Sequence, residues 1–140
     1  MIDPLQSYAG YLLRRASAIA MARLAKRLNA FGLSPAEATV LRVIEVNPSA
    51  KQADIGRLLD IARANMAPIV SRLARRELIE RQPVDRRSHG LVLTRDGRRL
   101  SGRINRVFVT HEAELLAKIS PAHREGFLAG VTALMERRPK

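Results

Sequence analysis

The spacing of apolar residues changes once along this chain, and this change constrains the fold more than any other feature. Up to about residue 76, and again after residue 97, apolar side chains recur every three or four positions, which is typical of amphipathic helices. Two short apolar runs, Leu78–Arg81 and Leu91–Thr94, break this period and indicate strands. The polar segment Gln82–Gly90 lies between them, so we predict a β-hairpin with a long, basic tip.

Boundary residues predict two helices near the start of the chain. Asp3-Pro4 is typical of an N-cap and a first helical position, so a long helix is expected from there to about residue 30. Gly32 is well placed to cap its C-terminal end. Ser34-Pro35-Ala36-Glu37 has the pattern of a capping box and begins the second helix, which should stop before Asn47-Pro48.

A pair of shorter helices should follow, over about residues 51–59 and 62–76. The first is expected to bury Ile55, Leu58 and Leu59, and a stripe of Met66, Ile69, Val70 and Leu73 should form the buried face of the second. Two helices joined by a tight turn and followed by a hairpin form a winged helix-turn-helix. In that arrangement the second helix fits the major groove of DNA, and the hairpin tip reaches the minor groove.

Two further helices are predicted after the hairpin, from about residue 97 to 118 and from Ser120-Pro121 onward. The last helix should turn Phe127, Val131 and Leu134 inward, and the tail Arg137–Lys140 is expected to fray. The predicted fold class is therefore mainly α with a small two- or three-stranded β wing (α+β), in which a winged helix-turn-helix is combined with further helices.

The charge of the chain indicates a polyanionic partner. The chain holds 25 Lys and Arg against 13 Asp and Glu, a net charge of +12, and residues 51–106 carry 14 of these cations against 6 acids. This surplus favours nucleic acid, although genomic base composition can also enrich a protein in arginine. The absence of cysteine excludes disulfides and thiol chemistry. No run of about 18 apolar residues exists, so we expect no membrane partner and a cytoplasmic location.

The stretch from Asp85 to Gly97 resembles the wing of the MarR family of bacterial transcription regulators. The family pattern is Asp, any residue, Arg, three residues, an aliphatic residue, one residue, Leu-Thr, two residues and Gly. The matching residues here are Asp85, Arg87, Leu91, Leu93-Thr94 and Gly97. The helix order on both sides also agrees, so the resemblance covers nearly the whole chain. One position departs from the pattern, because the family's usual Gly before Leu-Ile is Glu77 here.

The resemblance implies a sequence-specific, DNA-binding transcription regulator, and within that class a ligand-responsive homodimeric repressor. It would bind a pseudo-palindromic operator in double-stranded DNA and respond to a small aromatic or anionic effector. Within a single domain over residues 1–140, residues 33–96 would form the winged helix-turn-helix lobe. Residues 1–32 and 97–140 would form the helical dimerisation region.

The candidate DNA contacts lie on the second helix of the pair and on the wing. On the helix, small side chains are expected to touch thymine methyl groups and polar ones to read bases. In the wing, the resemblance assigns Arg87 to the minor groove, Arg86 and Ser88 are expected at phosphates, and Asp85 should orient Arg86 or Arg87 by an ion pair. A solvated surface position is the alternative for each. The helix candidates are Arg63, Ala64, Asn65, Pro68, Arg72 and Arg75.

Other site residues are less defined by the sequence. Tyr11, Arg15 and His111 are candidates for effector binding, with helix packing, a solvated face and a buried core position as their respective alternatives. We predict no cofactor, no metal site and no catalytic residues, because the chain has no Gly-rich phosphate loop and no paired carboxylates at an evident site. The alternative function is a non-specific architectural DNA-binding protein, which would not prefer an operator over random DNA.

Overall fold

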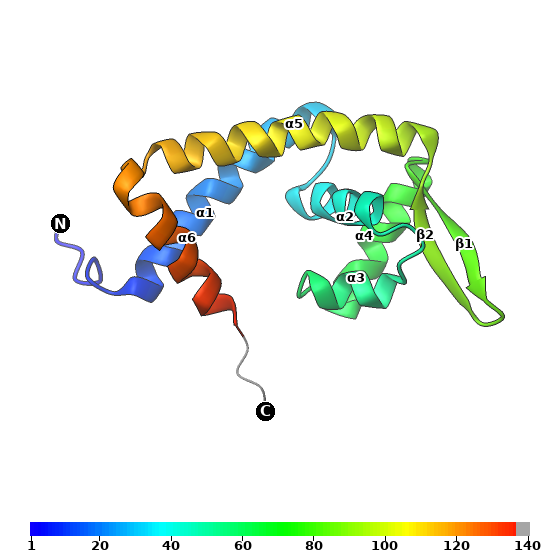
Figure 1. Cartoon of the computed structure of the whole chain (residues 1–140), viewed down its shortest axis with the longest axis horizontal. Helices are drawn as coiled ribbons and strands as arrows, with labels where there is room; N and C mark the ends of the chain where they lie inside the picture. The colour runs from blue at the N-terminus through cyan, green and yellow to red at the C-terminus, as the bar shows by residue number, and fades with distance from the viewer. Residues whose placement is uncertain (137–140) are drawn as a thin grey trace. The chain divides into compact units, whose positions relative to one another are not determined.

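The computed structural model describes residues 1–136 and confirms the predicted fold class. Six α-helices and one two-stranded antiparallel sheet follow one another along this part of the chain (Figure 1). The elements are α1 (Ala9–Leu28), the 3-10 turn η1 (Asn29–Phe31), α2 (Pro35–Val46), α3 (Gln52–Leu58), α4 (Arg63–Arg75), β1 (Ile79–Asp85), β2 (Ser88–Leu93), α5 (Arg95–Ala117) and α6 (Pro121–Met135). They divide into two compact units, residues 1–107 and a second unit that begins at Phe108. No helix among the described residues is long and apolar enough to cross a membrane.

The first helix begins later than the sequence predicted. α1 starts at Ala9, its N-cap is Tyr8, and Asp3 is not its cap. The Asp3 carboxylate instead accepts hydrogen bonds from the Leu5 backbone N–H (3.0 Å) and the Tyr11 hydroxyl (2.6 Å). Because Tyr11 extends from the flank of α1 and occupies this carboxylate, the first residues form turns instead of helix.

The boundaries of α2 are as predicted. Gly32 has φ of +63°, a left-handed conformation that glycine adopts at little cost, and it ends the preceding 3-10 turn. At Ser34 both bonds of the capping box are present, from the Glu37 backbone N–H to the Ser34 hydroxyl and from the Ser34 N–H to the Glu37 carboxylate. α2 then runs through the centre of the first unit and buries Val40, Leu41 and Ile44 completely.

The helix pair α3 and α4 forms as predicted, with one exception in its core. The predicted face of α4 is buried in full, and its four residues are Met66, Ile69, Val70 and Leu73. In α3, however, Ile55 is buried and Leu58 is 67% exposed, so the predicted burial of Leu58 is wrong. Because α3 has only seven residues and ends at Leu58, this side chain lies at the helix end, outside the core.

The hairpin strands are longer and its tip is shorter than predicted. β1 and β2 pair antiparallel from Ile79–Leu93 to Asp85–Ser88, with a register shift between Pro83 and Asp85. Only Arg86 and Arg87 remain as the loop, where the sequence had suggested nine residues. Proline and glycine within the segment hid the strands, since both residues are poor strand formers. The wing is two-stranded, with one isolated bridge from Ala50 to Leu91.

The exit of α4 is a Schellman motif that carries a strained residue. The Leu78 N–H donates to the Leu73 carbonyl (3.0 Å) and the Glu77 N–H to the Ala74 carbonyl (2.9 Å). Glu77 closes the motif with φ of +55°, in the left-handed region that favours glycine. The position at which the sequence departs from the MarR-family pattern that it resembles is therefore a position at which the backbone conformation suits glycine.

The start of α5 is fastened to the same exit. The Thr94 hydroxyl donates to the Glu77 carbonyl (2.7 Å) and accepts the Gly97 N–H (3.0 Å), so it joins two elements. The Thr94 N–H also donates to the Leu78 carbonyl (3.1 Å). A Cβ atom at Gly97 would lie 1.9 Å from that carbonyl oxygen. The Leu-Thr and Gly of the wing pattern thus hold the end of the hairpin against the end of α4.

In the second unit, α6 leaves apolar side chains exposed that the sequence had placed inward. Phe127 is 39% and Leu134 is 72% exposed, and Val131 is partly exposed. The prediction was wrong because an apolar stripe on a helix shows only that the helix is amphipathic. It does not show that the stripe is buried within one chain. Ser120 is the N-cap residue of α6 but makes no side-chain capping bond. The predicted frayed tail, Arg137–Lys140, lies outside the described residues.

Substitution of Gly97 and of Gly102, both in α5, should have opposite effects on stability. Gly97→Ala forces the Leu78 carbonyl to move and should lower the free energy of unfolding by about 3 kcal/mol. Gly102→Ala meets no atom within 4 Å and should raise it by roughly 0.5–1 kcal/mol through helix propensity. Urea unfolding followed by circular dichroism measures both, and equal effects of the two substitutions would contradict the close approach at Gly97.

Glu77→Gly should stabilise the protein by about 1 kcal/mol, because it relieves the left-handed strain without removing a hydrogen bond. Glu77→Gln is the control, since it removes the charge but keeps the strain, and it should leave the urea midpoint unchanged. A Gln variant as stable as the Gly variant would show that charge, and not backbone conformation, is responsible.

Candidate nucleic-acid interface

The outer face of α4 is small and weakly polar, as the sequence suggested. Ala64, Asn65 and Pro68 are exposed, together with Arg63 and Arg75 at its two ends. The helix is continuous through Pro68, and its N-cap, Ala62, offers no side-chain hydrogen bond. α4 packs on α2, α3 and β1, so the same contacts that bury its apolar stripe turn this plain face outward.

Arg72, a candidate for base readout, has a partner within the fold. Its Nε donates to the Glu37 carboxylate, and Glu37 is buried whereas the Arg72 side chain is half exposed. Burial alone would raise the pKa of Glu37. The hydrogen bonds from the Ser34 N–H and from Arg72 outweigh burial, so this pKa is lower than usual. Arg72 therefore joins α4 to the first turn of α2, and only part of its guanidinium faces solvent.

The tip of the wing is organised around Asp85. Its carboxylate accepts the Arg87 backbone N–H (2.8 Å) and the Ser88 hydroxyl, and it forms an ion pair with Lys51 (3.4 Å). These contacts, with the Ser88 bond the strongest, lower the pKa of Asp85 to about 2. The predicted ion pair of Asp85 with Arg86 or Arg87 is wrong, because the carboxylate fixes the loop backbone and takes its cation from the start of α3.

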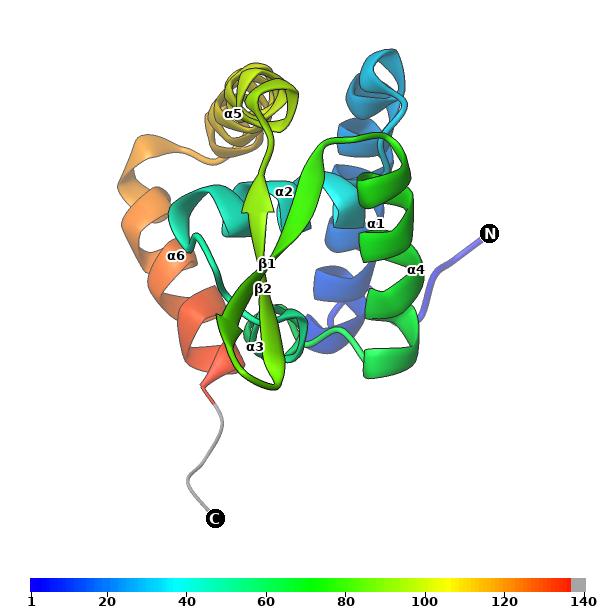
Figure 2. The same cartoon turned by 90° about the vertical axis from the view of Figure 1, so that its right-hand side faces the viewer.

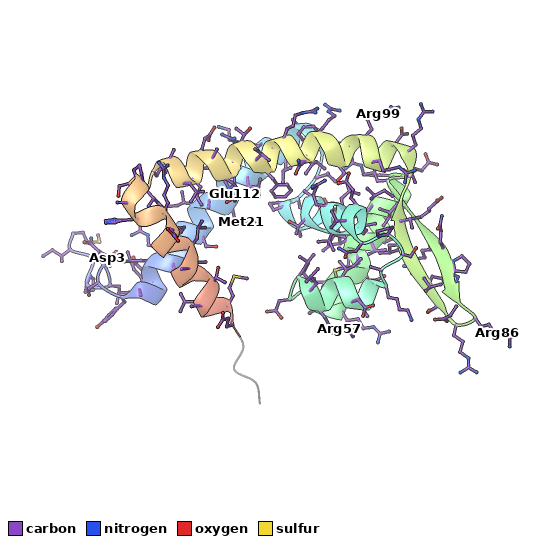
Figure 3. All side chains as sticks on the ribbon, in the orientation of Figure 1. Asp3, Met21, Arg57, Arg86, Arg99 and Glu112 are labelled. Atoms are coloured by element: carbon purple, nitrogen blue, oxygen red, sulfur yellow. The ribbon has the colours of Figure 1, made fainter. Side chains whose placement is uncertain are left out.

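The two loop arginines present their charge to solvent. Arg86 and Arg87 are exposed, and neither guanidinium has a hydrogen-bond or ion-pair partner within residues 1–136. Figure 3 shows Arg86 extending outward from the wing tip, with Arg57 of α3 on the same side of the first unit. The wing therefore carries unpaired cations on a backbone that is already ordered, which suits it to contact phosphates or a narrow groove.

Sequence reasoning missed the residues that connect the wing to α3. Lys51 pairs with Asp85, and Arg81 of β1 donates to Gln52 (3.3 Å). Both contacts join residues about 30 positions apart, so no local pattern could indicate them. They stabilise the hairpin relative to the helix pair, which sets where the wing tip lies with respect to α4.

Two of the three effector candidates lie together. The Tyr11 hydroxyl and the Arg15 guanidinium meet at Asp3 (2.6 and 3.3 Å), and the Arg15 guanidinium lies 5.6 Å from the centre of the Tyr11 ring. His111 is buried and belongs to the second unit. Among the described residues no group of three or more His, Asp or Glu could hold a metal ion.

Comparison with known proteins agrees with this geometry. A sequence model of the MarR family matches residues 31–88, the helix pair and the first part of the wing. The repressor CouR, solved with a 23-mer DNA duplex, superposes with a TM-score of 0.88 at 29% identity over 97% of this chain and 98% of its own. The chain is therefore similar to MarR-family transcription regulators in the segment 31–88, and to the repressor CouR over nearly its whole length. Its helix pair α3–α4 and its hairpin form a winged helix-turn-helix like that of the DNA-binding regulators in this family.

A second complex of CouR and one further relative extend this likeness. CouR bound to p-coumaroyl-CoA superposes with a TM-score of 0.89 at 27% identity, over 99% of each chain. A protein of Thauera aromatica, described as a putative transcriptional regulatory protein for the hcr operon, is 29% identical over 132 residues. The alignment covers 92% of this chain and 79% of the relative.

Titration of Asp85 tests the architecture of the wing tip. Because its pKa in the folded protein (about 2) lies below the ordinary 3.8, its stabilisation of the wing is complete above about pH 4 and is lost as the pH falls through 2. Carboxyl-carbon NMR should therefore give a midpoint near 2. Ser88→Ala should raise that midpoint more than Lys51→Met, and the reverse order would contradict the described geometry.

Proposed function

We propose that this protein is a homodimeric repressor that binds a pseudo-palindromic DNA operator and releases it when a small aromatic or anionic ligand binds. One observation carries the DNA-binding part: two unpaired arginines stand on a preordered wing tip, in the same compact unit as the exposed face of α4. Residues 33–96 form the DNA-binding lobe of this proposal, and residues 1–32 and 97–140 form its dimerisation region.

Exposed apolar residues support the homodimer. In α1, four large apolar residues are 42–50% exposed, and they are Leu12, Leu13, Ile19 and Met21. In α6 the most exposed are Leu128, Leu134 and Met135 (49–76%). Surfaces of this kind on helices are typical of interfaces between subunits, since water contact with so many apolar side chains is unfavourable.

In this proposal the wing and α4 make different kinds of contact with DNA. Arg86, Arg87 and Ser88 anchor the wing at phosphates and in the minor groove. The plain face of α4 approaches the floor of the major groove closely, so Ala64 and Pro68 contact thymine methyls and Arg63 and Asn65 hydrogen-bond to bases. Specificity that a small, weakly polar face cannot supply would come from DNA shape.

Removal of the wing arginines should weaken binding to the operator and to random DNA. For Arg86→Gln/Arg87→Gln we expect a roughly 10–100-fold lower affinity. The slope of the logarithm of the binding constant against the logarithm of the salt concentration should become shallower by about 0.9 for each phosphate that is no longer neutralised. The control, Arg23→Gln/Lys26→Gln on α1, removes equal charge and should have little effect. Fluorescence anisotropy with operator and random duplexes at several salt concentrations measures this, and unchanged affinity of the wing variant would exclude the wing from the interface.

Substitution on α4 should change specificity in addition to affinity. For Asn65→Ala we expect about a tenfold or greater weakening at the operator and almost none on random DNA, because a hydrogen-bonded base contact is worth about 1–3 kcal/mol. A ratio of operator to random affinity near one for the unmodified protein would favour the alternative, a non-specific architectural protein. A ratio of roughly a thousand supports the repressor.

The ligand class is proposed from the relative and from one cluster. CouR is described in complex with p-coumaroyl-CoA, and here Tyr11 and Arg15 offer an aromatic ring beside a cation, which suits an aromatic acyl thioester or acid. The probes are p-coumaroyl-CoA, salicylate and free coenzyme A. A true effector should raise the melting temperature of the protein and dissociate the operator complex, with weaker effects in Tyr11→Phe/Arg15→Gln. Stabilisation without release would contradict ligand-driven derepression.

The remaining parts of the proposal concern activity and place. The family acts by binding DNA, so we propose that the protein catalyses no reaction, and turnover of any thioester probe would overturn this. Because its partner is chromosomal DNA, we propose that it works in the cytoplasm.

A further inference from the structure

The first half of α5 carries a dense row of arginines on its solvent side. At about 100° per residue, five arginines of residues 95–107 fall within an arc of roughly 140°. We call them the α5 stripe, and they are Arg95, Arg98, Arg99, Arg103 and Arg106, all exposed. The opposite side of the helix, with Ser101 and Ile104, is fully buried against the first unit.

The stripe is unfavourable for the helix that bears it. Arg95, Arg98 and Arg99 occupy the N-terminal turns, where the helix dipole favours anions, and the arginines follow one another at three- and four-residue spacings, where like charges repel. Asp96 compensates only Arg99, through an exposed pair at 3.5 Å. Apart from this pair and a contact of Arg103 with Phe31, folding gives no reason for the cluster, which points to a ligand.

Most of the stripe is available for such a ligand. Arg95, Arg98 and Arg106 have no hydrogen-bond or ion-pair partner in the part of the chain that the structure describes. The Arg103 guanidinium stacks on the Phe31 ring at 4.9 Å, which fixes one member of the row. Figure 3 shows Arg99 on the opposite side of the first unit from Arg57 and Arg86, and in Figure 2 α5 again lies opposite α3 and the wing tip. The stripe is thus separate from the α4 and wing surface.

The chemistry of the stripe favours a nucleic-acid backbone over a protein or a membrane. No large apolar residue of residues 95–107 is strongly exposed, whereas protein interfaces need an apolar core and interfacial helices need an apolar face. Guanidinium groups bind phosphates with two parallel hydrogen bonds. From Arg95 to Arg106 the row is about 16 Å long, along which duplex DNA presents several phosphates.

We infer that the α5 stripe binds the phosphate backbone of a second DNA segment, without sequence preference, while α4 and the wing hold the first. The protein would then bring two DNA segments together. This inference goes beyond operator binding. It rests on the proposed binding of DNA by α4 and the wing but does not require sequence preference, since the stripe needs no base contacts. The second segment is either a separate duplex or DNA flanking the first site on the same molecule, and both present the same phosphates.

A capture experiment with the full-length protein tests the inference. An immobilised 30-base-pair duplex, operator or random, is saturated with protein in 50 mM salt, and a labelled random duplex is added. The unmodified protein should capture the label. Arg98→Gln/Arg106→Gln should reduce capture at least tenfold while it leaves occupancy of the first duplex within twofold. The matched control Arg23→Gln/Lys26→Gln, also exposed on a helix, should capture as the unmodified protein does.

Further arms separate the sources and the competing partners. A second experiment uses the same 30-base-pair site with 50-base-pair flanks. If the unmodified protein protects the flanks, the stripe variant does not, and no second duplex is captured, then the second segment is flanking DNA and the inference stands. Capture by the stripe variant equal to that of the unmodified protein overturns it. The inference is also overturned if the unmodified protein shows neither capture nor flank protection. It is overturned as well if the stripe binds polyglutamate and does not bind DNA. Operator preference is measured separately, so a failure of the repressor proposal leaves these results interpretable.

Discussion

Three chain segments meet at the Leu78 carbonyl, and the geometry of the DNA-binding unit depends on how closely they meet. This oxygen accepts the Thr94 N–H, and α5 passes it at position 97 so closely that only glycine fits. The Thr94 hydroxyl adds a bond to the neighbouring Glu77 carbonyl. One polar junction therefore ends α4, closes the base of the wing and begins α5, so none of the three can move far without the others.

A second set of contacts fixes the far end of the wing, where the junction has no influence. The hairpin has a two-residue loop between only two strands, which would be marginally stable alone. Asp85 holds the Arg87 backbone and reaches Lys51 at the start of α3, so the tip is ordered before DNA arrives. An ordered cationic loop loses less conformational entropy on binding than a flexible one, which compensates for the plain face of α4.

Local patterns made much of this fold predictable. The Ser34 capping box and the Met66 stripe require only residues within one or two helical turns, and the structure confirms both. Where a partner lay far along the chain, prediction failed: Asp3 was assigned to an N-cap because its bond to Tyr11 could not be foreseen, and Lys51 gave no sign of its role at the wing. Leu134 illustrates another limit, because an amphipathic pattern does not say which surface covers it.

The distribution of arginine roles distinguishes a functional surplus from a compositional one. Arg76 spans the end of η1, with bonds to the Gly32 and Phe31 carbonyls (2.7 and 2.9 Å), and Arg72 is paired with the buried Glu37. Arg72 and Arg76 stabilise the fold, and enrichment in arginine through base composition would be enough to explain them. Arg86 and Arg87 serve no fold contact on a backbone that is fixed to present them, and the α5 stripe gathers cations where its helix disfavours them. Composition alone would scatter unpaired charge, so its concentration at two separate places supports the proposed polyanion contact at both.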